Sequence, residues 1–204
     1  MFPIHSWKEL LWKVILGLLI AGFAYLAGCI VTKVIRRNGY QAHTKLNLTL
    51  SVLAAVAIYL RYGATLVTVQ GLFLFFVLLY ASWSDISTML VGDYIWVLIL
   101  ALSLVGLRTE TAQSMLLGAL VVFLPQWLLS VIPPHKTLGG ADIKISTSLA
   151  FLLGFPRGMV AYLLGLLLAI IGMSIYNKAK QRSQRKSFAL VPFLGIGAML
   201  VFLI

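Results

Sequence analysis

The acidic residues are the side chains of this sequence best suited to chemistry, because only five occur among 204 residues. They are Glu9, Asp85, Asp93, Glu110 and Asp142. Two carboxyl groups held a few ångströms apart cannot both ionise easily, so one keeps a proton while the other acts as a base. Such a pair can activate a water molecule and protonate a leaving amine, which is hydrolysis of the aspartic type. A site of this kind requires a fold that brings two of the five acids together.

The segments between these acids are strongly apolar. Hydrophobic residues make up 61% of the chain and charged residues 10%, with a mean hydropathy of +1.02, outside the range of soluble domains. A membrane-spanning helix needs about 20 mostly apolar residues. The sequence therefore predicts an all-α, polytopic transmembrane helix bundle of about eight spans, forming a single domain over residues 1–204 without a soluble domain. The expected spans are residues 11–35, 46–62, 64–84, 94–108, 114–132, 145–156, 158–177 and 187–204.

The sixth expected span is short and contains Ser and Thr, and a break at Gly154, Phe155 and Pro156 follows it. This pattern indicates a helix shielded by protein or a tight re-entry. The fourth expected span, residues 94–108, is also shorter than a full bilayer crossing requires.

The basic residues predict how the spans are oriented. If the eight spans alternate in direction and the N-terminus lies outside, eleven of the sixteen Lys and Arg residues fall on one side of the membrane and five on the other. The positive-inside rule assigns the richer side, including the run 178–186, to the cytoplasm. A lipid-headgroup or partner site is the alternative for that run. Asp85, Asp93 and Asp142 then fall on the cytoplasmic side, while Glu9 and Glu110 fall outside.

Other partners and cofactors are not expected. The net charge of +11 would point to nucleic acid in a soluble chain, but in a membrane chain it reports topology, so no nucleic acid partner is expected. One cysteine, Cys29, cannot form an internal disulfide or a thiolate zinc site. The three His residues show no ligand spacing, so neither a metal nor another cofactor is predicted.

Two of the acids also fit a structural role, because Asp is a common N-cap and both Asp93 and Asp142 precede apolar runs. For Asp93 the cap is the favoured interpretation. Asp142 lies in LGGADIK, where Gly139 and Gly140 permit a tight turn and close approach of a substrate chain, so a functional role is favoured there. The same glycines lack the spacing and the Lys-Ser/Thr pair of a phosphate-binding loop.

At these residues the sequence resembles the type 4 prepilin peptidase family of membrane aspartic peptidases. Residues 84–95, SDISTMLVGDYI, are similar to the family's catalytic Asp followed by a polar stretch and an Ile-Pro-Asn or Leu-Pro-Asp step. Asp85 takes the catalytic place, and Val91 and Asp93 match the later step. Gly92 stands where the family usually has Pro, and either residue can preserve a turn there.

Residues 138–144 resemble the family's GxGDxK signature, with Gly139, Asp142 and Lys144 matching and Ala141 at the second glycine. Alanine would fail there only if the backbone needed a positive φ.

Residues 188–200, FALVPFLGIGAML, are similar to the family's closing Pro-Phe-x-Pro-Phe-Leu-x-x-Gly element through Pro192, Phe193, Leu194 and Gly197, and this element is interpreted as architectural. The three stretches run in the family's order from about residue 70 onward.

The resemblance implies a membrane peptidase with Asp85 and Asp142 as its catalytic pair. The other motif positions, which become candidates for substrate contact, are Gly139, Gly140, Ala141, Lys144 and Asp93. The implied substrate is the basic leader of a prepilin or pseudopilin, cut at the cytoplasmic side of the bacterial inner membrane. Relatives that also methylate carry a large insertion after the first span, often with paired CxxC motifs. This chain has RRNGYQAHTK there, so N-methylation is not expected.

Two other functions are compatible with the same acids. A carrier could use Asp85 and Asp142 to bind a cation or relay protons, although both lie at span ends and no inverted repeat is evident. An inactive relative could instead assist pilin assembly.

Lys144 could bind a substrate carboxylate or pair with Asp142. That pairing requires Asp142 to lie in the loop before the helix, because residues two apart do not face each other on a helix.

Overall fold

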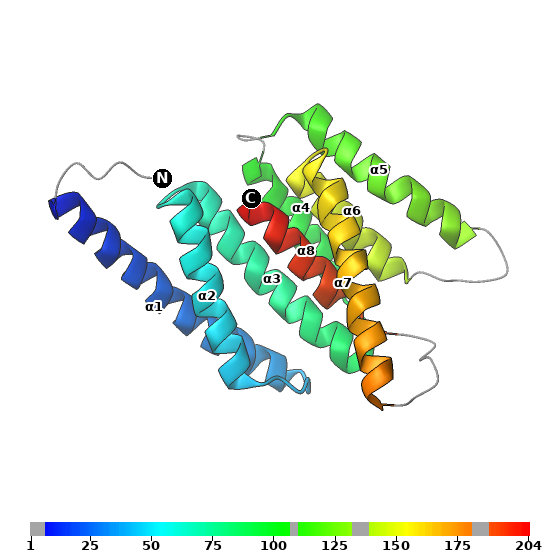
Figure 1. Ribbon diagram of the computed structural model, residues 1–204, viewed down its shortest axis with the longest axis horizontal. Helices are drawn as coiled ribbons and strands as arrows, with labels where there is room; N and C mark the ends of the chain where they lie inside the picture. The colour runs from blue at the N-terminus through cyan, green and yellow to red at the C-terminus, as the bar shows by residue number, and fades with distance from the viewer. Residues whose placement is uncertain (1–6, 107–109, 132–138, 181–187) are drawn as a thin grey trace.

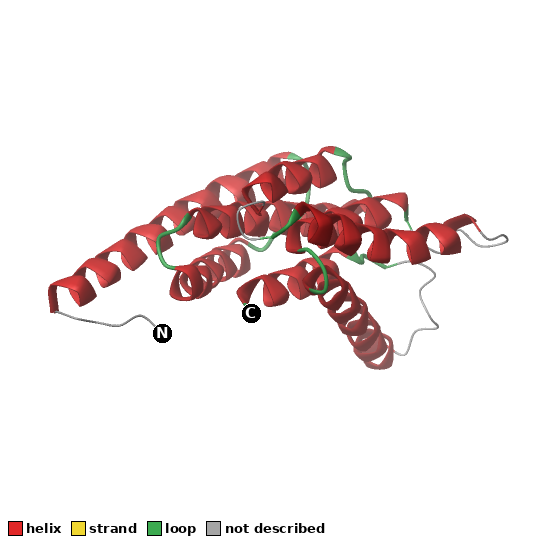
Figure 2. Cartoon of the chain, turned by 90° about the horizontal axis from the view of Figure 1, so that it is seen from above, coloured by secondary structure: helices red, strands yellow, loops and turns green. Residues whose placement is uncertain are grey.

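The computed structural model describes residues 7–106, 110–131, 139–180 and 188–204, and the described chain is helical, without strands (Figures 1 and 2). The helices are α1 (Trp7–Arg37), α2 (Thr44–Tyr62), α3 (Leu66–Thr88), α4 (Tyr94–Gly106), α5 (Ala112–Val131), α6 (Gly140–Leu153), α7 (Arg157–Lys180) and α8 (Val191–Leu203). The all-α prediction is confirmed.

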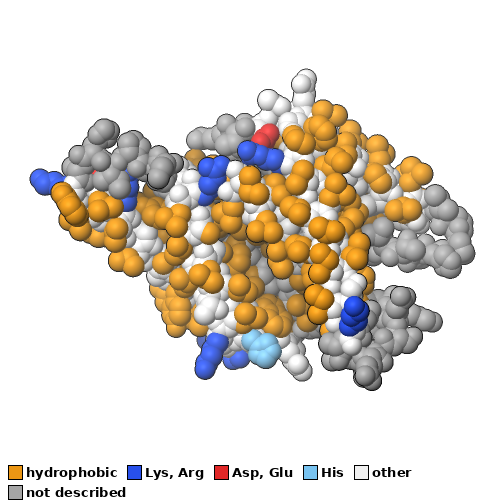
Figure 3. Space-filling model, viewed as in Figure 1, with side chains coloured by type: hydrophobic (Ala, Val, Ile, Leu, Met, Phe, Trp, Pro, Cys, Tyr) orange, Lys and Arg blue, Asp and Glu red, His pale blue; other side chains and the backbone are white. Residues whose placement is uncertain are grey.

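Apolar side chains cover the outside of the bundle. Helices α1, α2, α3, α5 and α7 are long and apolar enough to cross a membrane, and α4 and α8 are shorter apolar helices. Leu18 and Leu19 on α1 are 69% and 64% exposed, which is unfavourable in water over so large a surface. Figure 3 shows the same on one face, where hydrophobic side chains fill the middle and Lys, Arg and His lie at opposite margins. The chain is a membrane protein.

Helix α3 lies at the centre of the bundle, with α1 and α2 on one side and α4 and α8 on the other (Figure 1). Its residues Leu74 and Leu78 are buried in the main core cluster, against Ile99 of α4 and Leu194 of α8. The core therefore holds the C-terminal end of α3 next to the N-terminal ends of α4 and α8. We call this end of the bundle, where α3 ends and α4, α6 and α8 begin, the aspartate end.

The connection from α3 to α4 turns at a residue that the sequence did not single out. Met89 adopts the left-handed conformation, with φ of 53°, and its N–H donates to the Asp85 carbonyl at 2.8 Å. Gly92, expected to preserve the turn, has no positive φ. A Cβ there would lie 2.3 Å from the Tyr94 ring, so what glycine provides is space for that ring.

Helix α6 begins at Gly140, five residues before the expected start at 145, so the prediction that Asp142 precedes this helix was wrong. The apolar-run criterion missed the first turn because Asp142 and Lys144 are charged. That turn is partly open to solvent, and an acid in the first turn is favourable for a helix. Deeper in the helix, Ser146 and Gln126 of α5 form a buried hydrogen bond of 2.9 Å, as expected of a helix shielded by protein.

Helices α7 and α8 approach closely at a glycine of the third motif. A Cβ on Gly197 would lie 2.5 Å from the Ala161 carbonyl oxygen and 2.7 Å from the Gly165 nitrogen. Small residues at such crossings let membrane helices pack backbone against backbone. This crossing fixes α8, whose first turn lies beside Asp85.

Candidate active site

Asp85 lies in the last turn of α3 and is buried, with 6% of its surface exposed. Its Oδ2 accepts a hydrogen bond of 2.9 Å from the Val191 N–H, the first residue of α8. Pro192 follows in the first turn of α8, where its missing N–H has no helical partner to lose. The positive end of the α8 dipole and its free N–H thus hold the buried Asp85 carboxylate.

Asp142 lies in the first turn of α6 and is half-buried. Gly139 is the N-cap residue, and its N–H donates to the Asp142 carboxylate. The Asp142 N–H donates in turn to the Gly139 carbonyl at 3.0 Å. An acid at the third helical position that reaches back to the N-cap N–H is half of a capping box. The helix start therefore fixes the direction of the Asp142 side chain.

The two carboxyl groups lie within electrostatic range of each other, since the charge of Asp85 acts on Asp142. Helices α3 and α6 both pack against α4 and α8, and side chains of all four helices belong to the main core cluster. The spacing between the two acids is therefore set by the α4 and α8 helices that join α3 to α6.

Lys144 pairs with Asp93 and not with Asp142. Its Nζ lies 2.6 Å from Asp93 Oδ1, and the two side chains are 47% and 72% exposed. This ion pair lowers the pKa of Asp93 below its usual range. The Lys144 ammonium also lies 5.9 Å from the centre of the Trp96 ring. The sequence analysis considered an ion pair between Lys144 and Asp142, but both residues lie on α6, two positions apart, where their side chains do not face each other. Asp93, which directly precedes α4, is the acid that pairs with Lys144.

None of the remaining residues of the second motif has a positive φ, so what distinguishes them is the space around each Cα. Gly139 has φ of −66°, and a Cβ there would lie 3.0 Å from Asp142 Oδ2. Gly140 is exposed, with nothing within 4 Å of an added Cβ. Ala141 is helical and has no positive φ, so alanine fits this position.

Comparison with known proteins identifies the family. The model of the type IV leader peptidase family matches residues 72–174, just over half of the chain. The chain belongs to this family. The matched range includes Asp85, Asp93, Asp142 and Lys144. No curated protein and no solved structure shows a significant match.

This peptidase has polar groups beside the aspartates that sequence reasoning missed. Tyr162, from α7, lies within electrostatic range of Asp142. Its signal in the sequence is a single hydroxyl within an apolar run. The N–H of Val191 was also missed, although Pro192 marks a helix start there, and a helix start supplies free N–H groups.

A second polar cluster ties the connection after α1 to α3 and α4 in the peptidase. The Tyr80 hydroxyl oxygen accepts hydrogen bonds from the Asn38 amide at 2.9 Å and the Tyr94 hydroxyl at 3.0 Å. Ser84, next to the candidate Asp85, donates to the Leu90 carbonyl at 2.8 Å. This cluster orders the backbone on both sides of Asp85.

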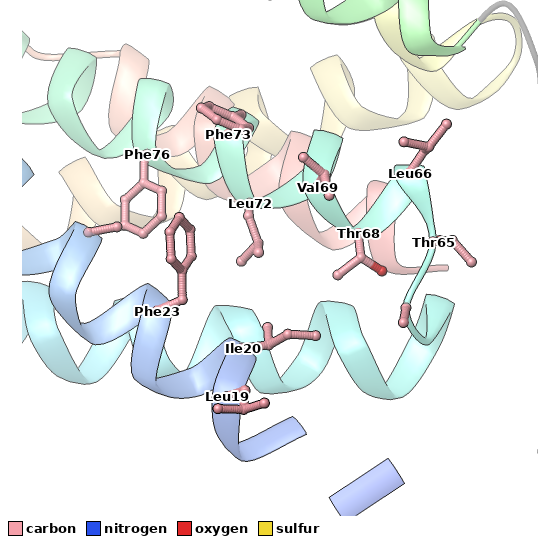
Figure 4. A pocket seen from close by; sticks show the side chains of 12 residues that line it. Leu19, Ile20, Phe23, Thr65, Leu66, Thr68, Val69, Leu72, Phe73 and Phe76 are labelled. Atoms are coloured by element: carbon pink, nitrogen blue, oxygen red, sulfur yellow. The ribbon is translucent and has the colours of Figure 1, made fainter. Parts of the chain in front are cut away.

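A cavity of 680 Å³ elsewhere in the peptidase has no chemical groups suited to hydrolysis. It lies between α1 and α3, and Figure 4 shows Phe23 and Phe76 pointing toward each other across it. Its lining is apolar apart from Thr65 and Thr68.

Among the described residues, no three His, Cys, Asp or Glu side chains lie close enough to hold a metal ion.

Proposed function

We propose that this leader peptidase is an aspartic endopeptidase that cleaves the leader of prepilin or pseudopilin precursors, with Asp85 and Asp142 as its catalytic pair. The observation that carries the proposal is the proximity of these two acids, close enough for the charge of one to act on the other although they lie 57 positions apart in the sequence, and both fall within the family match. In the proposed reaction a water molecule held between them attacks the scissile carbonyl. One carboxylate takes the proton from the water, and the other, protonated, polarises the carbonyl oxygen.

The surroundings of each acid support this chemistry. Asp85 is held by the Val191 N–H and Asp142 by the Gly139 N–H, so neither carboxylate has to be ordered when substrate binds. The scissile bond must be extended, since a helical carbonyl is already hydrogen-bonded. Gly140 is exposed and is the first residue of α6, so its backbone N–H has no partner within the helix and supplies a hydrogen-bond donor for an extended peptide.

The proposed location is the cytoplasmic side of the bacterial inner membrane. The ends of α1 and α2 at the aspartate end carry Lys33, Arg36, Arg37 and Lys45. By the positive-inside rule this end faces the cytoplasm. A peptidase site there meets the junction between a basic leader and the hydrophobic helix that follows it.

We further propose that the chain does not methylate its product. Residues 38–43 connect α1 to α2, and a segment of this length cannot enclose a methyl-donor site. The single cysteine, Cys29, cannot build the thiolate zinc site of the longer relatives. Mass spectrometry of the cleaved pilin, with a methyl donor present, tests this point.

The test of the main proposal is cleavage of a leader that ends in Gly, in detergent or liposomes. Wild type is compared with Asp85→Asn and Asp142→Asn, which keep side-chain size but remove the titratable acid, and with Glu9→Gln, which removes an acid at the opposite end of the bundle. We expect both Asn variants to lose activity by at least 10²-fold and Glu9→Gln to keep it. Retained cleavage in either Asn variant would refute the dyad. A wild type inactive on all leaders would favour a carrier or an inactive assembly partner.

A further inference from the structure

The acidic residues of the chain are unevenly available to a substrate. Glu9 lies in the first turn of α1 and Glu110 next to the first turn of α5, both at the end opposite the aspartates. At the aspartate end, Asp85 is buried and Asp142 is half-buried. Asp93 differs from both, with 72% of its side chain exposed. Since the full sequence has five acids, Asp93 is the one well-exposed negative charge at the aspartate end.

The rest of that end is positively charged. The basic residues on the ends of α1 and α2 there are Lys33, Arg36, Arg37 and Lys45. These cations repel a positively charged peptide over roughly the Debye length of 8–10 Å. A basic segment brought to Asp85 and Asp142 therefore needs a local negative partner, and Asp93 follows Asp85 by eight positions, at the end of the connection from α3 to α4.

The present partner of Asp93 can be exchanged. The ion pair with Lys144 is largely exposed, and exposed pairs contribute little to stability because water and salt screen them. If Lys144 leaves Asp93, its ammonium still has the face of the Trp96 ring, 5.9 Å from the ring centre. Lys144 thus occupies Asp93 in the free enzyme without being held there strongly.

We propose that Asp93 is the specificity-determining residue of this peptidase and binds a basic side chain of the leader in exchange for Lys144. This inference rests on the proposed function, because it needs a basic leader as substrate. Lys144 lies two positions after Asp142 on α6, which places their Cα atoms about 5 Å apart in an α-helix. A leader cation that takes the place of the Lys144 ammonium on Asp93 therefore lies within one lysine side-chain length of the α6 turn that carries Asp142, and the ion pair fixes the register of the peptide.

The test measures kcat and KM for two leader peptides that differ only in their Lys and Arg residues, which are replaced by Gln in the neutral version. In the Lys144→Gln background, where no internal ion pair has to be broken, Asp93→Asn should raise KM for the basic leader about two- to fivefold, the range of an exposed ion pair, and leave kcat unchanged. The same variant should leave both constants for the neutral leader unchanged, which also shows that it is folded. Glu9→Gln, with the same loss of charge at the other end, should match wild type on both leaders.

The exchange makes a second, opposite prediction. Lys144→Gln removes the competitor for Asp93 and should lower KM for the basic leader, with no such gain for the neutral one. Asp93→Lys should reverse the preference and favour a leader whose basic residues are replaced by Glu.

The outcomes separate this inference from the proposed function. If Asp93→Asn affects both leaders equally, or if Lys144→Gln raises KM for the basic leader, the inference is overturned while the peptidase stands. If the wild type cleaves neither leader, the proposed function fails, and the assignment of Asp93 fails with it.

Discussion

The adjacent glycines of the second motif allow a test of how Asp142 is positioned. Gly139 has φ of −66° and ψ of 137°, which alanine adopts without strain. Its added Cβ would nevertheless lie 3.0 Å from Asp142 Oδ2, whereas an ordinary contact begins at 3.4 Å. Gly139→Ala must therefore shift the carboxylate by about 0.4 Å, the difference between these distances. At Gly140 an added Cβ meets nothing within 4 Å.

The size of the effect follows from this displacement. A misplacement of 1 Å can cost about 10²-fold in rate, so 0.4 Å scales to about sixfold if the logarithm of the rate follows distance. We expect Gly139→Ala to lower kcat about sixfold. Gly140→Ala, which retains its backbone N–H, should change kcat by less than about twofold and stabilise the fold by about 0.4–1 kcal/mol.

The assay is steady-state cleavage of a Gly-ended leader in detergent, with thermal unfolding of both variants measured in parallel. Unfolding shows whether a lower rate reflects lost protein or a moved carboxylate. Equal effects of the two substitutions on kcat, or a larger loss at Gly140, would refute the argument that the space at Gly139 holds Asp142 in place.

Three further predictions concern the fold around the site. Asp85→Ala leaves the first backbone N–H of α8 without its buried acceptor and should lower the free energy of unfolding by about 1–3 kcal/mol, while Asp85→Asn, which keeps an acceptor, should lose less; equal losses in thermal melts would contradict this role. Gly197→Ala should lower the unfolding free energy by about 1–3 kcal/mol, because its Cβ would meet the α7 backbone, whereas Gly195→Ala, whose nearest neighbour lies at 3.6 Å, should melt near wild type. The lowered pKa of Asp93 means that its ion pair with Lys144 stabilises the protein above pH about 4 and stops doing so as the pH falls through that lowered pKa. The stability difference between wild type and Lys144→Gln should therefore disappear in acid, and a difference that persists there would argue against the pair.

Much of the candidate site could be predicted because the sequence contains so few charged residues. In an apolar chain each acid must sit where water or a partner can reach it, so Asp85 and Asp142 were predicted near span ends. The start of α6 was misplaced for a related reason, since hydropathy reports the apolar core of a helix and not its solvated first turn. Lys144 was consequently considered as a partner of Asp142, although both residues lie on α6.

The sequence by itself determined the helical membrane fold, the order of the motifs and the small set of acids from which a catalytic pair can be chosen. These features follow from local composition and spacing, which hydropathy and helix geometry translate directly into spans and ends. Only the tertiary structure decided the partners. Asp85 receives the Val191 N–H from 106 positions away, and Lys144 reaches Asp93 across 51. Such contacts depend on how α4 and α8 pack between α3 and α6. Apolar surfaces pack without directional bonds, so the sequence contains no residue pattern that predicts which helix ends will meet.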